Sequence, residues 1–155
     1  MVKLLIIITS ISLFVIIALF ILGYMSHSGK AYGLVEGRLK QCPDTPNCVS
    51  SEFVSDAEQY IEPLVYSAGH AAQVLPRLKT IIREMGGSVQ VEKTDYLAAT
   101  FTSSVFRFVD DLELRIDTGQ KTIHLRSASR AGYGDGGVNR KRVEFLKNSF
   151  HLKSD

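Results

Sequence analysis

The longest run of apolar positions lies at the N-terminus, where residues 4–22 contain no charged residue. As a helix, these 19 positions span roughly 28 Å, close to the thickness of the hydrocarbon core of a bilayer. A cleaved signal peptide usually has a shorter apolar core, of about 7–15 residues, before a small-x-small cleavage site. Residues 23–28 match such a site poorly. We therefore expect an uncleaved transmembrane helix at residues 1–25, with the lipid membrane as the partner of residues 4–22.

Two later segments show the spacing of three and four between apolar residues that is typical of an amphipathic helix. The first runs from Ala71 to the glycine pair at residues 86–87. Pro76 either kinks this helix or stands in the first turn of a second one. The second segment covers residues 139–152. Both stripes are narrow enough to bury one face against a sheet.

Between these helices, apolar and polar residues alternate as they do in half-buried strands. The most regular alternation lies on either side of a turn at residues 118–119. A two-residue loop would place Glu113 opposite His124. A four-residue loop also keeps the apolar residues of both strands on one face of the hairpin, whereas a three-residue loop puts apolar opposite polar positions. Strands are expected at residues 61–66, 88–92, 96–102, 112–117 and 122–126.

This order of elements predicts an α+β fold, a two-layer sandwich in which two helices cover a mainly antiparallel sheet of about five strands. An N-terminal transmembrane helix precedes it. We expect a linker and cysteine-containing loop at residues 26–59 and the α+β domain at residues 60–155. Hydrophobic residues make up 45% of the chain and charged residues 22%, as in globular domains. The net charge of +2 is too small to indicate nucleic acid as a partner.

The only two cysteines, Cys42 and Cys48, frame a loop that contains two prolines. No second Cys/His pair stands at zinc-ligand spacing, so we expect no metal site. The cysteines are either unpaired thiols in a turn or a disulfide, and a disulfide requires an oxidising compartment. We expect the disulfide, with the C-terminal domain on the extracytoplasmic side of the membrane.

The basic residues near the apolar run favour the opposite orientation. One lysine precedes the run, and three basic residues follow it within the next 18 positions. Counted literally, the positive-inside rule slightly favours a cytoplasmic domain. The basic residues concerned are Lys3 on one side and Lys30, Arg38 and Lys40 on the other.

Positive charge and glycine concentrate between Arg126 and Arg142. This segment joins the end of a strand to the start of a helix, and a helix N-terminus beside glycines and arginines can bind an anion. Neither a Walker nor a Rossmann spacing is present. In the alternative interpretation, the arginines pair with carboxylates inside the domain. The expected ligand contacts are Arg126, Arg130, Gly136, Gly137, Asn139 and Arg140.

The double aspartate at residues 110–111 raises a related question. Asp111 shares the polar face of its strand with Glu113, so Asp110 is expected to point to the apolar side or to sit in a bulge. A carboxylate there needs a partner, and the arginines of residues 126–142 are the natural candidates. Asp110, Asp111 and Asp135 are therefore expected to support the arginines. A metal or acid/base site made by these three lacks a flanking histidine or glutamate, and we assign no catalytic residue and no cofactor.

Three sequence blocks resemble one known family: CPDTPNCVSSE at residues 42–52, FVDDLELRID at 108–117 and IHLRSASRAGYGDGGVNRKRVE at 123–144. It is the family named domain of unknown function 1499, found in bacteria and plants. The resemblance covers roughly residues 34–150 and implies that the three blocks belong to one domain. Since the family has no established activity, the resemblance implies no reaction. Its members are often membrane-attached or exported, which agrees with an extracytoplasmic domain.

Together, these observations favour a membrane-anchored extracytoplasmic domain that is not an enzyme. Its partner would be an anionic small molecule or lipid head group, bound by the arginine–glycine segment. The alternative is a hydrolase-like enzyme that uses Asp110 and Asp111 with the arginines as a clamp. Such an enzyme requires a closed pocket that holds both Asp110 and Arg130.

Overall fold

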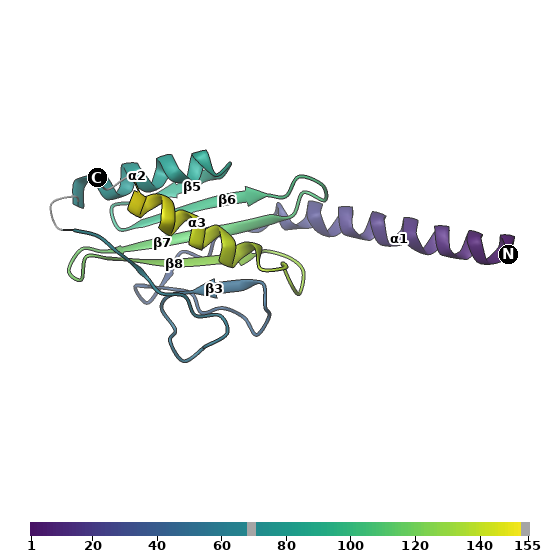
Figure 1. Cartoon of the computed structure of the whole chain (residues 1–155), viewed down its shortest axis with the longest axis horizontal. Helices are drawn as coiled ribbons and strands as arrows, with labels where there is room; N and C mark the ends of the chain where they lie inside the picture. Colours follow the sequence, from purple (N-terminus) through teal and green to yellow (C-terminus); the bar gives the residue numbers. More distant parts are fainter. Residues whose placement is uncertain (68–70, 153–155) are drawn as a thin grey trace.

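The computed structural model describes residues 1–67 and 71–152. A long helix, α1 (Val2–Ser26), projects from a body formed by one main sheet and two further helices (Figure 1). Within the described part of the chain, α1 is the one helix that is long and apolar enough to cross a membrane. Its apolar side chains are exposed along most of its length. A membrane span and a signal sequence share this length and composition.

Antiparallel pairing runs through the main sheet, in the order β3-β8-β7-β6-β5. A sixth strand, β4, pairs with β8, and β1 and β2 form a separate two-stranded sheet. Both α2 and α3 pack on one face of the main sheet, so the predicted α+β fold is confirmed (Figure 1). The bounds are β1 (Leu34–Val35), β2 (Arg38–Leu39), β3 (Cys48–Ser50), β4 (Leu64–Val65), α2 (Ala71–Glu84), β5 (Ser88–Glu92), β6 (Tyr96–Thr102), β7 (Val109–Asp117), β8 (Thr122–Ser129) and α3 (Val138–Leu152).

The core lies between the helices and the sheet, because apolar residues alternate along β7 and β8 and so share the face that the helices cover. Every second residue of each strand points to the helices, and the apolar residues at these positions are buried. Burial of a side chain of this size stabilises the fold by about 1.5–3 kcal/mol. The fully or almost fully buried members from these two strands are Leu112, Leu114, Ile116, Ile123 and Leu125.

The β7–β8 hairpin has the longer of the two loops that the alternation permits. Asp117 pairs with Thr122, so four residues form the loop, and Glu113 lies opposite Arg126 instead of His124. Asp117 Oδ1 accepts a hydrogen bond from the Gln120 amide at 2.9 Å. This backbone hydrogen bond is the main cause that lowers the pKa of the Asp117 carboxyl.

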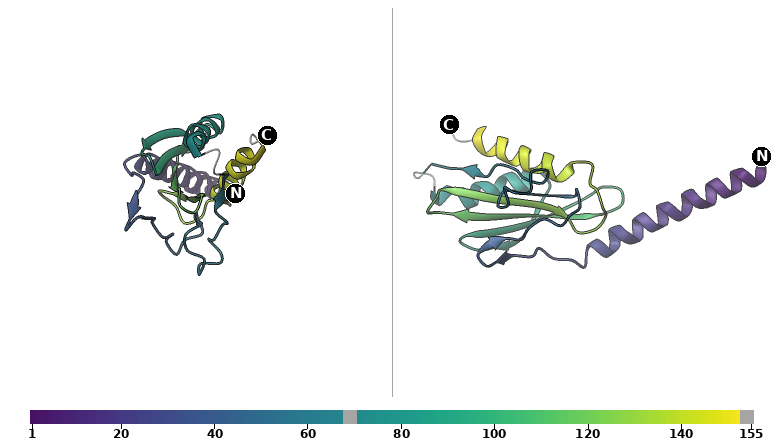
Figure 2. Two further views of the ribbon diagram at one scale, coloured as in Figure 1. Left: turned by 90° about the vertical axis from the view of Figure 1, so that its left-hand side faces the viewer. Right: turned by 90° about the horizontal axis from the view of Figure 1, so that it is seen from below.

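The segment at residues 26–59, expected to be a linker and a cysteine-containing loop, contains three short strands. β3 lies in the main sheet beside β8, and the β1–β2 segment packs on the face opposite the helices (Figure 2, right). There Leu39 is buried with Tyr96 and Ala98. Strands of two or three residues are too short to show a period-2 pattern, which is why the sequence did not reveal them.

Two other local expectations change in detail. The strand expected at 61–66 is reduced to β4, which begins directly after Pro63. Proline cannot donate a hydrogen bond to a neighbouring strand, which restricts it to such positions. α2 continues through Pro76 as a single helix.

Candidate functional site

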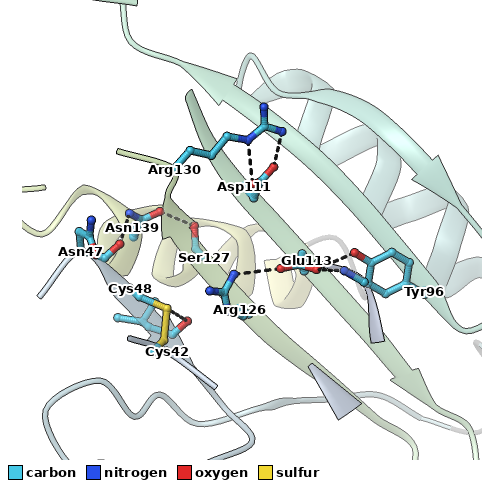
Figure 3. Close-up of polar contacts among 12 residues, drawn as sticks. Cys42, Asn47, Cys48, Tyr96, Asp111, Glu113, Arg126, Ser127, Arg130 and Asn139 are labelled. Atoms are coloured by element: carbon cyan, nitrogen blue, oxygen red, sulfur yellow. Dashed lines mark hydrogen bonds and ion pairs between the residues drawn. A yellow bond between two sulfur atoms is a disulfide. The ribbon is translucent and has the colours of Figure 1, made fainter. Parts of the chain in front are cut away.

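The two aspartates at the start of β7 lie on opposite faces of the sheet. On the helix side, Asp110 accepts a hydrogen bond from Arg142 Nη2 of α3 at 2.7 Å. On the other side, Asp111 accepts two from Arg130, at 2.8 and 2.7 Å (Figure 3). In the structure, the partner of Asp110 thus belongs to the arginine segment. Because the sheet separates them, the two carboxylates do not face one common substrate position.

A second ion pair lies deeper on the same outer face. Glu113 is 0% exposed and Arg126 is 3% exposed, and Arg126 Nη1 donates to Glu113 Oε2 at 2.9 Å (Figure 3). The other carboxylate oxygen accepts from Tyr96 Oη at 2.6 Å and from the Gly33 amide at 2.9 Å. Gly33 has φ +77°, a conformation that favours glycine. Burial, then the hydrogen bond to Glu113, raise the pKa of Tyr96 above its ordinary value.

Asn139, one of the expected ligand contacts, is a buried structural residue. Its Oδ1 accepts from Ser127 Oγ at 2.6 Å, and its Nδ2 donates to the Asn47 carbonyl at 3.0 Å (Figure 3). These bonds connect α3 to β8 and to the loop before β3. With 1% exposure, Asn139 holds three elements together.

The N-terminus of α3 already holds a carboxylate. Asp135 Oδ1 accepts from the Gly137 amide at 2.9 Å, and Oδ2 accepts from the Asn139 amide at 2.7 Å. These are the N–H groups that an external anion would use. Asp135, expected to support an arginine, thus caps the helix, and Gly136 lies in the turn between cap and helix.

A cavity of about 580 Å³ lies beside this cap, at the β3 edge of the sheet. Arg140 reaches it, but its guanidinium donates to the carbonyls of Glu58 at 2.6 Å and Tyr60 at 3.2 Å. The carboxylates in the lining outnumber this arginine, so the local field opposes an anion. We call it the acidic cavity, and its charged lining residues are Asp44, Asp56, Glu58, Asp135 and Arg140.

A second cavity, of about 410 Å³, lies on the outer face of the sheet, where the segment after α1 crosses it. Arg126 and Arg130 line it, and Glu113 and Asp111 offset their charges. The surplus positive charge comes from two lysines, for which no ion pair is found within the described residues. We call it the basic cavity, and its charged lining residues are Lys30, Lys40, Asp111, Arg126 and Arg130.

Two residues that line the basic cavity carry donors for which no hydrogen-bond partner is found among the described residues. Arg126 Nε is buried, and no hydrogen-bond partner is found for it in the described part of the chain. Lys40 Nζ lies 3.5 Å from the centroid of the Tyr32 ring, a cation–π contact that leaves its N–H groups without an anionic partner. Unsatisfied donors of this kind favour a ligand that accepts hydrogen bonds.

The disulfide separates the two cavities. Cys42 and Cys48 are bonded, as expected, and Cys48 pairs with Ala128 of β8. Cys42 lines the basic cavity and Cys48 lines the acidic cavity. The short loop between them therefore forms part of both walls.

Comparison with known families identifies the family to which the chain belongs. The sequence model of a family described as "Protein of unknown function (DUF1499)" matches residues 38–150. The chain belongs to the DUF1499 family. The match extends from β2 through α3 and omits α1 and Lys30. No curated protein matches the chain, and the family description assigns no activity, so the function of this DUF1499 protein has to be argued from the cavities.

Sequence reasoning located part of the basic cavity and missed the rest. Arg126 and Arg130 line it, whereas Gly137, Asn139 and Arg140 line the acidic cavity. The missed residues are Lys30, Tyr32, Lys40 and the ion-pair partner Glu113. A four-residue hairpin loop would have paired Glu113 with Arg126. No local pattern marks the two lysines, because they belong to a segment without periodicity.

Proposed function

We propose that this DUF1499 protein is a membrane-anchored extracytoplasmic domain that binds an anionic ligand in the basic cavity. α1 serves as the anchor, and the domain presents the cavity close to its end. The observation that carries the proposal is the charge of the lining. Asp111 and Glu113 offset the charges of Arg130 and Arg126, so Lys30 and Lys40 leave a surplus of positive charge.

The chemistry of the lining suits phosphate or carboxylate groups. Lysine ammonium groups are compact donors that bind an oxyanion as point charges. Arg130 and Arg126 are held in place by Asp111 and Glu113, so they require little ordering when a ligand arrives. The ion pairs that the sequence suggested as an alternative to ligand binding therefore prepare the site for it.

Two observations support an extracytoplasmic location of the domain: the disulfide, and the contacts that the basic residues after α1 make within the folded domain. A Cys42–Cys48 bond persists in an oxidising compartment. Arg38 Nε donates to Glu52 Oε2 at 2.9 Å, and Lys30 and Lys40 line the cavity. These charges serve the folded domain, and long domains cross the membrane largely regardless of charge.

Binding is tested with inorganic phosphate on the full chain in non-ionic detergent, followed by ³¹P NMR line broadening. Lys30→Gln/Lys40→Gln should weaken binding by roughly 2- to 30-fold, because each exposed charge contributes about 0.2–1 kcal/mol. Lys93→Gln/Lys141→Gln is the matched control, since both lysines are exposed and line neither cavity. Equal loss in both variants would show nonspecific attraction and contradict the proposal.

The location is tested by alkylation of protein freshly extracted from its native membrane. Cys42 and Cys48 should react only after reduction. Modification of both thiols without reductant would contradict the extracytoplasmic assignment.

A further inference from the structure

The last turn of α1 is fixed on the body of the protein. At Gly23, an added Cβ would lie 1.8 Å from the carbonyl oxygen of Phe106, so only glycine permits this approach. Three residues later, Ser26 Oγ accepts a hydrogen bond from the Val109 amide at 2.9 Å. The loop between β6 and β7 is therefore held against the helix, and α1 and the sheet are joined at a defined angle (Figure 2, right).

Aromatic contacts give the depth of this loop relative to α1. The rings of Phe20 and Phe106 lie 5.2 Å apart, edge to face, and Phe108 follows at 6.5 Å from Phe106. Phe20 belongs to the uncharged segment 4–22, so Phe106 lies at the level of its final turn. Val105, at the tip, is 63% exposed. If α1 spans a bilayer, the β6–β7 loop lies in the interface between hydrocarbon and head groups.

The basic cavity begins at nearly the same level. Arg130 Nη1 donates to the carbonyl of Ser26, the last residue of α1, at 3.4 Å. From residue 22 to residue 26 the helix rises about 6 Å, and the head-group layer on each side of a bilayer is about 5–8 Å thick. Gly29 and Lys30, which follow directly, line the cavity. The cavity therefore opens where lipid phosphates lie.

We infer that the ligand of the basic cavity is the phosphate group of an anionic membrane lipid. The inference rests on the proposed anion binding and on α1 as the anchor. The phosphate oxygens accept hydrogen bonds from Lys30 and Lys40, which supply the surplus positive charge of the cavity. Free phosphate offers the same chemistry, but the opening beside the end of α1 gives a lipid the shorter path.

The test uses the full chain reconstituted in nanodiscs of phosphatidylcholine, with or without phosphatidylglycerol, and native mass spectrometry of the lipids retained on release. Phosphatidylglycerol should be retained over phosphatidylcholine. Lys30→Gln/Lys40→Gln should lower this retention by roughly 10- to 30-fold, whereas Lys93→Gln/Lys141→Gln should not change it.

The outcomes separate the inference from the proposed function. If inorganic phosphate binding depends on Lys30 and Lys40 but phosphatidylglycerol retention does not, the lipid inference is overturned and anion binding stands. If neither depends on the lysines, both are overturned. If the chain fails to enter nanodiscs at all, the anchor itself is wrong.

The depth of the β6–β7 loop is measured independently. In Val105→Cys the disulfide leaves one free thiol for a nitroxide label, and Thr94→Cys, exposed in the β5–β6 turn, is the matched control. A label at residue 105 should be more accessible to oxygen than to a water-soluble nickel relaxant, and a label at residue 94 should show the reverse. Equal accessibility at both positions would place the cavity away from the head groups and overturn the inference.

Discussion

The basic and acidic cavities share a wall, and the segment between Arg126 and Arg142 contributes to both, yet their charges are opposite. In the basic cavity, arginines of this segment share the lining with Lys30 and Lys40. In the acidic cavity, Arg140 shares the lining with the carboxylates of Asp44, Asp56 and Glu58. The difference teaches that the net charge of a cavity is decided by the segments that fold over it.

The arginines also differ in what they do for the fold. Arg126 and Arg130 bind carboxylates, whereas Arg140 donates to backbone carbonyls. An arginine in a buried ion pair cannot be removed without stranding its partner, while one that contacts exposed carbonyls can. The two cavities should therefore respond differently to mutation.

The largest effect is expected for Arg126→Ala. Glu113 is fully buried and would lose its cationic partner, and breaking a buried ion pair typically destabilises a fold by about 3–5 kcal/mol. Denaturant unfolding of the full chain in non-ionic detergent measures the loss. Arg83→Ala, on the exposed side of α2, is the control and should change stability by less than about 0.5 kcal/mol. A loss below about 1 kcal/mol for Arg126→Ala would mean that the pair is dispensable for folding.

Loss of the disulfide should follow in size. Cys42→Ala/Cys48→Ala opens a short loop that forms the wall between the cavities, and the loop-closure entropy corresponds to about 2 kcal/mol. The same unfolding measurement applies, with the reduced wild-type chain as a second reference. Unchanged stability would indicate that hydrogen bonds from Gln59 and Asn139 hold the wall without the disulfide.

His124 gives a smaller, pH-dependent effect outside both cavities. Burial, then the charge of Arg115, lower the pKa of His124 below its ordinary value of about 6.5. The unfolded chain therefore binds a proton first as the pH falls. The stability contributed by neutral His124 is complete above about pH 6.5 and is lost as the pH falls toward the lower folded pKa, with a slope of at most about 1.4 kcal/mol per pH unit. His124→Gln should flatten this slope between about pH 5 and 7, and parallel profiles would contradict it.

The smallest effect is expected from neutralising the acidic cavity. Asp44→Asn/Asp56→Asn should raise phosphate affinity by less than about threefold, because water and salt screen exposed charges outside the binding cavity. The measurement is the ³¹P titration used for the lysine variants. A gain above about tenfold would place the anion in the acidic cavity and reverse the comparison.

The elements of this fold that the sequence could predict are those with a local period. The stripes of α2 and α3, the alternation in β7 and β8, and the apolar length of α1 are properties of neighbouring residues. Asp110 was also predictable, because alternation places it on the apolar side, where a carboxylate needs a cation. Arg142 supplies that cation.

Tertiary structure decided what local patterns leave open. A shift of two residues in the β7–β8 register preserves every face, so the alternation alone does not distinguish His124 from Arg126 as the neighbour of Glu113. β3 joins β8 across a separation of more than 70 residues, and Lys30 and Lys40 reach the arginines only because the segment after α1 crosses the sheet. By itself, the sequence determined which segments repeat with a helical or strand period and which of their apolar residues are buried. The charge of each cavity depended on long-range approach, which no local period encodes.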